Sequence, residues 1–353
     1  MQEVLPFEKA FDYEHLFIAM KRCQKGVSWK PSVSRYLSNS ITNISKLSES
    51  VLNSTYIPGK FAQFITYSPK QREIVAANFK DRIVQRAFCD FIVYPKLTRS
   101  LIFGNVACQK GKGTDCGRSL LKQYLRRIYQ TSGTGFYYLQ LDIKGYYPNM
   151  DHKYINSLFK QKLTSKEYGL YLLLMNHYYP QVIGYNPGSQ LVQIAGIACL
   201  DKLDHYCKEV LHCRYYIRYM DDVIILHSDR TFLCRVLNDI CSHLAKIGFQ
   251  ANPKKTKIGK QITGIDFLGF TWAISRTGKV LIKVNNKSFK RAKQHWNHMI
   301  STASVHAHGL SYSDVVVAIE SYESYLSRAN CNKKIFAIIL NKKEALKCRK
   351  YTD

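Results

Sequence analysis

The stretch YYIRYMDDVIILH, residues 215–227, places an acidic pair in the middle of an otherwise apolar and aromatic run. Its two flanks carry the β-branched and aromatic residues that favour strands, with the acidic pair between them. This pattern predicts a β-hairpin with the two acids at its tip. A second apolar stretch, residues 136–148, is predicted to be a buried strand that carries Asp142 and ends at Pro148.

Helical and strand-like patterns interleave along the rest of the chain. Apolar residues recur at helical spacing in 7–60, with short breaks, and then in 81–97, 115–130, 152–178, 190–211, 231–247 and the basic region 283–353. Strand-like patterns occupy residues 63–79 and 264–284. Because strands and helices do not alternate strictly, the sequence favours an α+β fold over a doubly wound parallel sheet.

The chain is strongly basic. Its 353 residues include 52 Lys and Arg against 25 Asp and Glu, which gives a formal net charge of +27. The excess positive charge makes the chain repel itself, and a polyanionic partner would explain why the chain carries it. Counterion release from a phosphate backbone would supply much of the binding free energy. An acidic membrane surface is the competing partner, but the basic residues are spread along the whole chain. We therefore expect nucleic acid, and no membrane, as the partner.

We recognise no targeting signal and no metal-binding pattern of cysteines in the sequence. No apolar run is long enough for a transmembrane helix, and the acidic start MQEVLPFEKAFDYEHLF lacks the basic segment of a signal peptide. The 11 cysteines form no CxxC pair, so zinc-site spacing is absent. Reduced and mostly buried thiols are typical of a cytoplasmic protein, and we expect that location.

Asp142, Asp221 and Asp222 are predicted to lie at the ends of buried strands. A carboxylate there is a poor core residue unless it is paired or bound to a metal. Bringing Asp142 beside Asp221 would concentrate negative charge that a cation must neutralise. Hard oxygen ligands suit Mg²⁺, and two such ions can stabilise the attacking and leaving oxygens of an in-line phosphoryl transfer. The simpler alternative is that the Asp-Asp pair only caps a turn.

Short motifs along the chain resemble those of reverse transcriptases and follow the order of that family. They are REI (72–74), DRIVQ (81–85), GKGT (111–114), LDIKGYYP (141–148), YMDD (219–222), NPKKT (252–256) and FLGF (267–270). The first three resemble fingers motifs of group II intron and retron-type enzymes, and the next two resemble the family's carboxylate strand and YxDD hairpin. The last two resemble its lysine-bearing segment and primer grip. The chain is thus similar to bacterial reverse transcriptases, which are RNA-directed DNA polymerases.

The resemblance implies a right-hand polymerase fold with fingers, a palm of antiparallel sheet plus helices, and a helical thumb. It divides the chain into an N-terminal helical extension (1–60), fingers (61–135), a palm (136–282, with fingers–palm helices in 152–211) and a basic helical thumb (283–353). No RNase H, HNH endonuclease, integrase or maturase segment is recognised after the thumb. We therefore expect a minimal polymerase whose template and primer are supplied by other molecules.

The family's metal ligands carry over to matching positions. Its first aspartate and the first acid of the hairpin hold two metal ions, which implies these roles for Asp142 and Asp221. Asp222 matches the supporting second acid, and the carbonyl of Ile143 matches one that completes a metal shell. The implied cofactor is a pair of Mg²⁺ ions, with Mn²⁺ as an alternative.

The resemblance also implies residues that bind the nucleotide. Tyr147 occupies the position of an aromatic gate that excludes the 2′-hydroxyl of a ribonucleotide, although Tyr146 and Tyr147 could also be palm core. Lys255 matches a proton donor to pyrophosphate. Cations that could neutralise the incoming triphosphate are Lys70, Arg72, Lys110 and Lys112. For any one of these lysines, a solvated surface position is the alternative.

Two further sets are implied for the nucleic acid. The primer grip corresponds to Phe267, Leu268 and Gly269. In the basic C-terminal region, phosphate contacts along a duplex are predicted for Lys287, Lys290, Arg291 and Lys293. Solvated lysines are again the alternative.

One motif departs from the family pattern. Retron and group II enzymes carry QGxxxSP before the hairpin, and diversity-generating enzymes carry a variant that ends in SQ. Gly188 and Gln193 match the latter form, but Val192 replaces the serine. This segment contacts the nucleotide and the templating base in the family. The departure favours diversity-generating or defence-associated enzymes over the main retron and intron groups.

Three functions follow as hypotheses. The first is an RNA-directed DNA polymerase that copies a dedicated noncoding RNA in a bacterial antiphage defence system, and the second is the mutagenic enzyme of a diversity-generating retroelement. The third is a catalytically idle RNA-binding scaffold, which the intact set of three acids disfavours. Tyr147 and the fingers motifs disfavour an RNA-dependent RNA polymerase. The implied partners are an RNA template, a DNA or RNA primer and dNTPs, with an accessory protein or a second copy of the chain left open.

Overall fold

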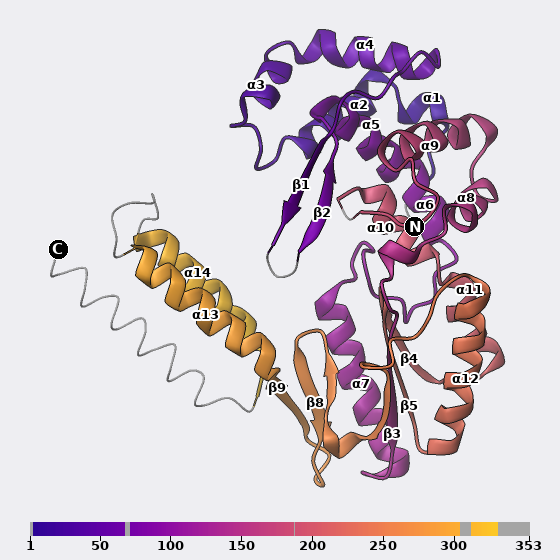
Figure 1. Ribbon diagram of the computed structural model, residues 1–353, viewed down its shortest axis with the longest axis vertical. Coiled ribbons are helices and arrows are strands. Elements are labelled where there is room, and N and C mark those ends of the chain that lie inside the picture. The colour runs from indigo at the N-terminus through magenta and orange to yellow at the C-terminus, as the bar shows by residue number, and fades with distance from the viewer. Residues whose placement is uncertain (1–2, 68–70, 187, 304–311, 331–353) are drawn as a thin grey trace, which may run out of the picture. The chain divides into compact units, whose positions relative to one another are not determined.

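The computed structural model describes residues 3–67, 71–186, 188–303 and 312–330 (Figure 1). The chain divides into two compact units, each assembled from separate stretches of sequence. The first comprises Met1–Gly113, Leu141–Val223 and Arg235–Thr256, and the second comprises Thr114–Gln140, Ile224–Cys234 and Lys257–Asp353. The division into fingers, palm and thumb is a functional one and stays a prediction.

The first unit begins with the helices that the apolar spacing predicts. They are α1 (Phe7–Ala10), α2 (Tyr13–Cys23), α3 (Pro31–Ser38) and α4 (Ser40–Leu52). Asp12 caps the start of α2, because its side chain accepts a hydrogen bond from the backbone N–H of His15. Leu16, Ala19 and Met20 are buried on one face of α2, which packs against α5 (Phe79–Phe88).

The strand-like pattern predicted over 63–79 corresponds to a pair of strands before α5. Strands β1 (Ala62–Thr66) and β2 (Arg72–Ala76) are antiparallel, with Phe64 opposite Ile74. After α5 the chain continues through a π-helical turn, η1 (Cys89–Val93), into α6 (Tyr94–Thr98).

Asp81 of the DRIVQ motif has a structural role at the start of α5. It is fully buried and accepts hydrogen bonds from the Tyr56 hydroxyl (2.6 Å), the Gly59 N–H (2.8 Å) and the Asn78 amide (2.8 Å). These bonds satisfy a carboxylate that would otherwise be costly to bury.

A four-stranded sheet carries the acidic motifs. Its strands are β3 (Tyr137–Asp142), β4 (Tyr215–Tyr219), β5 (Asp222–His227) and β6 (Lys257–Lys260), in the order β4-β5-β3-β6. The predicted hairpin is therefore present as β4 and β5. The connecting helices are α7 (Thr114–Ser132), η2 (Tyr147–Asn149), α8 (His152–Lys160), α9 (Ser165–Tyr178), α10 (Gln190–Ala198), α11 (Asp201–His205), η3 (Tyr206–Val210) and α12 (Arg230–Lys246).

One predicted boundary is wrong. Strand β3 ends at Asp142 and does not continue to Pro148, because Gly145 adopts a left-handed conformation (φ +57°) and the chain turns into the short helix η2. The helical stretches predicted over 152–178 and 190–211 are confirmed: the first contains α8 and α9, and the second contains α10, α11 and the π-helical turn η3.

The second unit contains a three-stranded antiparallel sheet of β7 (Ile265–Phe267), β8 (Phe270–Ile274) and β9 (Val280–Val284), after a short helix, η4 (Gln261–Thr263). Helix α7 packs against β8 and β9. The basic C-terminal region forms α13 (Asn286–Ala303) and α14 (Tyr312–Leu326), which pack against each other. Residues 331–353 lie outside the described part of the chain.

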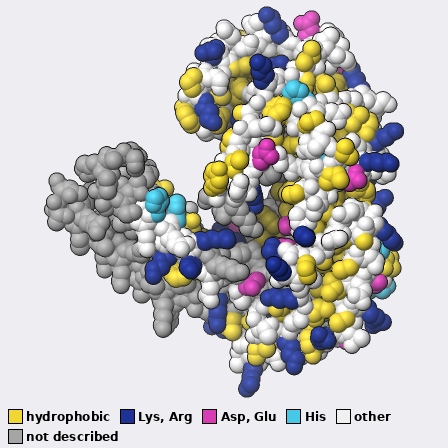
Figure 2. All heavy atoms as spheres, viewed as in Figure 1, with side chains coloured by type: hydrophobic (Ala, Val, Ile, Leu, Met, Phe, Trp, Pro, Cys, Tyr) yellow, Lys and Arg dark blue, Asp and Glu magenta, His cyan; other side chains and the backbone are white. Residues whose placement is uncertain are grey.

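The fold class is α+β with antiparallel strand pairs, as predicted. Among the described residues, no helix is both long enough and apolar enough to span a membrane. Lys and Arg side chains are scattered over the face in Figure 2, and Asp and Glu side chains are few there.

Candidate active site

Asp142 is the last residue of β3 and is 5% exposed. Its Oδ1 accepts a hydrogen bond from Nζ of Lys255 (2.5 Å), and its Oδ2 accepts one from the Asn252 side-chain amide (2.9 Å). The backbone N–H of Asn252 also donates to the Asp142 carbonyl (2.7 Å). The NPKKT segment therefore folds over the first acid of the predicted site.

The hairpin acids lie beside Asp142 because the backbone joins the two segments. The N–H of Ile143, the residue after Asp142, donates to the carbonyl of Asp221 (3.3 Å). Asp221 and Asp222 are half-buried, and Met220 before them has a φ of +56° that turns the chain sharply. All of these residues belong to the first unit.

Negative charge accumulates at this site. The pKa of Asp222 is raised to about 7, first by burial and then by the charges of Asp221 and Asp142, while Lys255 opposes the shift. The hydrogen bond to Asp142 raises the pKa of Lys255. Lys255 therefore faces three carboxyl groups, and the raised pKa of Asp222 favours its protonated form below about pH 7.

The donor set suits a hard divalent cation, although the side chains are not assembled around one. Within the described residues, no three or more His, Cys, Asp and Glu side chains group as a ready-made metal site. Both oxygens of Asp142 are engaged by Lys255 and Asn252. Carboxylate oxygens and a nearby backbone carbonyl are nevertheless the ligands that Mg²⁺ prefers.

The two tyrosines after Asp142 have different surroundings. Tyr146 is 4% exposed, and its hydroxyl donates to the Gly196 carbonyl (2.5 Å), so it is a core residue. Tyr147 is half-buried, and its hydroxyl lies 3.8 Å from Sδ of Met220 in the hairpin turn. Burial, together with the nearby Cys108 and Asp221, raises the pKa of Tyr147 well above its usual range. Tyr147 is thus the tyrosine that lies beside the acidic turn.

The predicted triphosphate ligands occupy different settings. Arg72 is exposed at the start of β2, and Lys70 lies outside the described residues. The ammonium of Lys112 donates to the carbonyls of Asn105 (2.9 Å) and Phe103 (3.3 Å), so it is held by its own loop. Lys110 is exposed, and its backbone N–H donates to the Tyr94 hydroxyl (2.6 Å).

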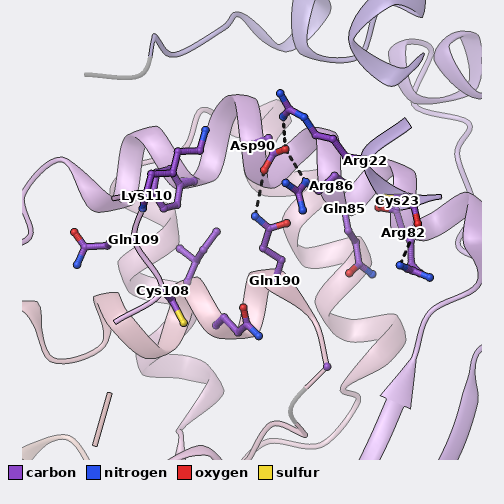
Figure 3. Close-up of a pocket in the computed structure, with 14 residues that line it drawn as sticks. Arg22, Cys23, Arg82, Gln85, Arg86, Asp90, Cys108, Gln109, Lys110 and Gln190 are labelled. Atoms are coloured by element: carbon purple, nitrogen blue, oxygen red, sulfur yellow. Dashed lines mark hydrogen bonds and ion pairs between the residues drawn. The ribbon is translucent and has the colours of Figure 1, made fainter. Parts of the chain in front are cut away.

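Lys110 also borders a basic pocket of about 520 Å³, which Gly188 and Gln193 help to line (Figure 3). The other basic residues of its lining are Arg22 from α2 and Arg82 and Arg86 from α5. No sequence motif assigns a binding role to Arg22 or Arg86, and Arg82 is noted only as part of the DRIVQ motif. The helical repeat in RIVQRAF could have placed Arg82 and Arg86 on one helix face, but no local signal relates them to Arg22.

A buried acid organises the arginines of this pocket. Asp90 is 2% exposed, and its Oδ2 accepts hydrogen bonds from Arg22 (2.5 Å) and Arg86 (2.6 Å). Its Oδ1 accepts one from the Gln190 side chain (3.2 Å), and Figure 3 shows these three partners converging on it. Asp90 therefore holds the two guanidinium groups together at the pocket.

Gly188 and Gln193 take different places in their motif. Gly188 has a φ of +145°, and a Cβ there would lie 2.9 Å from the Val75 carbonyl, so only glycine fits. Gln193 is exposed on α10, whereas Val192 beside it is fully buried. The residue that departs from the family pattern is therefore a core residue of the helix.

The predicted primer grip is a tight turn of the second unit. Leu268 and Gly269 both have positive φ, and the Leu268 carbonyl accepts a hydrogen bond from Arg118 (3.1 Å). The Tyr325 hydroxyl donates to the Gly269 carbonyl (3.2 Å). Phe267 is buried at the end of β7. The turn is therefore fixed by side chains of α7 and α14.

The predicted duplex track lies on α13. Lys290, Arg291 and Lys293 are exposed there, which leaves their charges accessible to a strand. The side chain of Lys287 lies outside what the structure describes.

Residues 67–272 match the family described as reverse transcriptase (RNA-dependent DNA polymerase). This match covers more than half of the chain and includes all three acids, and the chain therefore belongs to the reverse transcriptase family. Members of that family polymerise DNA on an RNA template, bind a template and a primer, and generally use divalent metal ions. No curated protein matches the sequence.

Proposed function

We propose that Asp142, Asp221 and Asp222 are the catalytic acids of an RNA-directed DNA polymerase. The observation that carries this proposal is the hydrogen bond from the Ile143 N–H to the Asp221 carbonyl, which brings the first acid next to the hairpin pair. Asp142, Asp221 and the Ile143 carbonyl would hold two Mg²⁺ ions, or Mn²⁺ as an alternative, with Asp222 in support. When bound, such ions polarise the attacking and leaving oxygens of nucleotidyl transfer.

Lys255 is proposed to deliver a proton to the leaving pyrophosphate. Its ammonium rests on Asp142. A metal ion bound at Asp142 would weaken the attraction between the two side chains, which would leave the ammonium of Lys255 free to reach the phosphates. A raised pKa keeps it protonated until a stronger acceptor is present.

Tyr147 is proposed to select deoxynucleotides. Its ring lies beside the acidic turn, whereas Tyr146 is committed to the core. A ring at this position would collide with a 2′-hydroxyl and leave a 2′-hydrogen unhindered.

The remaining residues are proposed to hold the nucleic acid and the triphosphate. Lys70, Arg72, Lys110 and Lys112 would contact the triphosphate, Gly188 and Gln193 would contact the nucleotide and the templating base, and Phe267, Leu268 and Gly269 would contact the primer. The arginines of the basic pocket beside Lys110 would take phosphates of the template strand, and α13 would follow the duplex with Lys287, Lys290, Arg291 and Lys293. We retain the corresponding division into an extension (1–60), fingers (61–135), palm (136–282) and thumb (283–353).

The proposal for the biological role is based on Val192, which replaces the serine of the family motif. A dedicated noncoding RNA in a bacterial antiphage defence system is the favoured template, and a diversity-generating retroelement is the alternative. Sequencing the nucleic acid that copurifies with the protein distinguishes them, because the first predicts one structured RNA and the second predicts a repeat transcript.

Primer extension by the purified chain tests the activity itself. We expect extension on an RNA template with dNTPs and little with NTPs, and no extension by the Asp221→Ala/Asp222→Ala variant. The variant should keep its RNA affinity, because removing clustered acids relieves repulsion. If the wild-type chain binds RNA but extends no primer under any metal condition, the idle scaffold is the better description.

A further inference from the structure

Arg218 lies in β4, three positions before Asp221, and its side chain is fully buried. A buried cation is costly unless it is paired and its donors are satisfied. Asp204 of α11, which is also fully buried, forms a two-point contact with Arg218. Nε of Arg218 donates to Oδ1 of Asp204 (2.7 Å), and Nη2 donates to Oδ2 (2.6 Å). This two-point contact fixes the plane of the guanidinium group.

The other donors of Arg218 reach backbone carbonyls on two further segments. Nη1 donates to the carbonyl of Met220 (3.0 Å), and Nη2 donates to that of Ile197 in α10 (2.8 Å). Arg218 therefore links the acidic hairpin turn to α10 and α11. All three segments belong to the first unit.

Neighbouring groups hold Asp204 in place. The Tyr216 hydroxyl donates to Oδ1 of Asp204 (2.6 Å), and the Asn105 amide donates to Oδ2 (3.4 Å) and to the Ile197 carbonyl (3.2 Å). Oδ1 of Asn105 has no hydrogen-bond partner among the described residues, but Asp204 itself accepts bonds from Arg218, Tyr216 and Asn105, and these bonds restrict its movement.

The carbonyl that Arg218 holds belongs to the strained residue of the turn. Met220 has a φ of +56°, a conformation that costs a non-glycine residue of order 1 kcal/mol or more. The Met220 carbonyl belongs to the peptide group that joins Met220 to Asp221. The orientation of this peptide group therefore affects the direction in which the Asp221 side chain leaves the turn. A donor at the Met220 carbonyl favours one orientation of that peptide.

We propose that Arg218, oriented by Asp204, is a positioning residue that holds Asp221 ready for a divalent cation beside Asp142. The inference rests on the proposed function of these acids. A buried ion pair is not needed for stability alone, because apolar replacements of such pairs are often neutral or stabilising. What an apolar pair cannot supply is a directed donor to the Met220 carbonyl.

The test compares Arg218→Lys with Arg214→Lys, which changes an exposed arginine just before the same strand. Lysine keeps the charge but loses the two-point contact. The first readout is Mn²⁺ binding to the chain without nucleic acid, followed by electron paramagnetic resonance. We expect the dissociation constant to rise about tenfold in Arg218→Lys, the usual scale for a residue that orients a metal ligand, and to stay unchanged in Arg214→Lys.

The second readout is primer extension as a function of Mg²⁺. In Arg218→Lys the Mg²⁺ concentration for half-maximal rate should rise by a factor similar to that of the Mn²⁺ dissociation constant. The KM for dNTP and the affinity for template should stay within about twofold of the wild-type values. Tyr216→Phe, which removes one hydrogen bond to Asp204 and keeps the ring, should shift both readouts in the same direction by less. It serves as the test if Arg218→Lys does not fold.

A merely structural role predicts a different result. The folded fraction and the amplitude of both signals would then fall while the metal dependence stayed unchanged, and that outcome overturns the proposal. If the wild-type chain extends no primer but Mn²⁺ binding still weakens in Arg218→Lys, the proposed polymerase activity fails and the positioning role stands.

Discussion

Nζ of Lys255 lies 2.5 Å from Oδ1 of Asp142, although 113 positions separate the two residues in the chain. Lys255 is itself 54% exposed, whereas the Asp142 side chain is 7% exposed. An exposed cation thus lies on the most buried acid of the proposed site. If Asp142 binds a metal ion as proposed, Lys255 would compete with that ion for the same carboxylate.

Replacing Lys255 with methionine should therefore have opposite effects on binding and on rate. Mn²⁺ should bind more tightly, because its competitor for Asp142 is gone. Polymerisation at saturating metal should slow by roughly 100-fold or more if Lys255 is the proton donor. Titration of Mn²⁺ and single-turnover primer extension measure the two effects. Lys254→Met is the matched control, and a slower rate together with weaker Mn²⁺ binding would contradict this prediction.

Asp222 should make the metal-free chain less stable as pH rises. Its pKa is higher in the folded chain, at about 7, than in the unfolded chain, so the folded state binds the proton more tightly. The free energy of unfolding therefore declines between about pH 4 and pH 7 and is then level. In EDTA, Asp222→Asn should melt above the wild type by more at pH 8 than at pH 5. Glu49→Gln changes an exposed acid and should show no such difference.

Tyr147→Val should admit ribonucleotides, because it opens space where a 2′-hydroxyl would lie. The ratio of kcat/KM for dNTP over NTP should fall by at least about tenfold, or about 1.4 kcal/mol of discrimination. Tyr146→Val should instead lower the melting temperature, since that ring is buried and its hydroxyl is bonded to Gly196. Ribonucleotide use by the Tyr146 variant alone would move the gate by one position.

Arg22→Met should weaken the binding of templates that carry a single-stranded 5′ extension. Arg22 lies outside the stretch that matches the family, yet it is paired with Asp90 at the basic pocket. Loss of one phosphate contact to a single strand should reduce the salt dependence of log K by roughly 0.7. Lys21→Met, one position earlier on α2, serves as the control. Equal effects of the two substitutions would mean that the pocket is not on the template path.

Neutralising Lys290, Arg291 and Lys293 together should flatten the salt dependence of duplex binding by roughly 0.9 log units per lost contact. Processivity should fall, while addition of a single nucleotide at saturating template should change less. A control variant with Lys46, Lys153 and Lys160 replaced by Ala removes the same charge from other exposed positions. If both variants keep the wild-type slope, the duplex follows another surface.

Local patterns in the sequence determined the secondary structure around the three acids. The apolar flanks around the acidic pair predict the hairpin, which β4 and β5 confirm, and the LDIKGYYP motif puts Tyr147 five positions after Asp142. These features depend on strand propensity and on the alternation of neighbouring residues, which a single stretch of chain contains. The predicted end of this strand at Pro148 is wrong, because the aromatic residues after Gly145 favour a strand although Gly145 turns the chain.

Only the tertiary structure decided which distant side chains meet. Lys255 on Asp142, Arg22 on Asp90 and Arg218 on Asp204 are contacts between separate segments. No local pattern specifies them, because each depends on how helices pack and how strands pair across the fold. The sequence by itself therefore predicts the acids of the proposed site, whereas tertiary packing determines which cations lie against them.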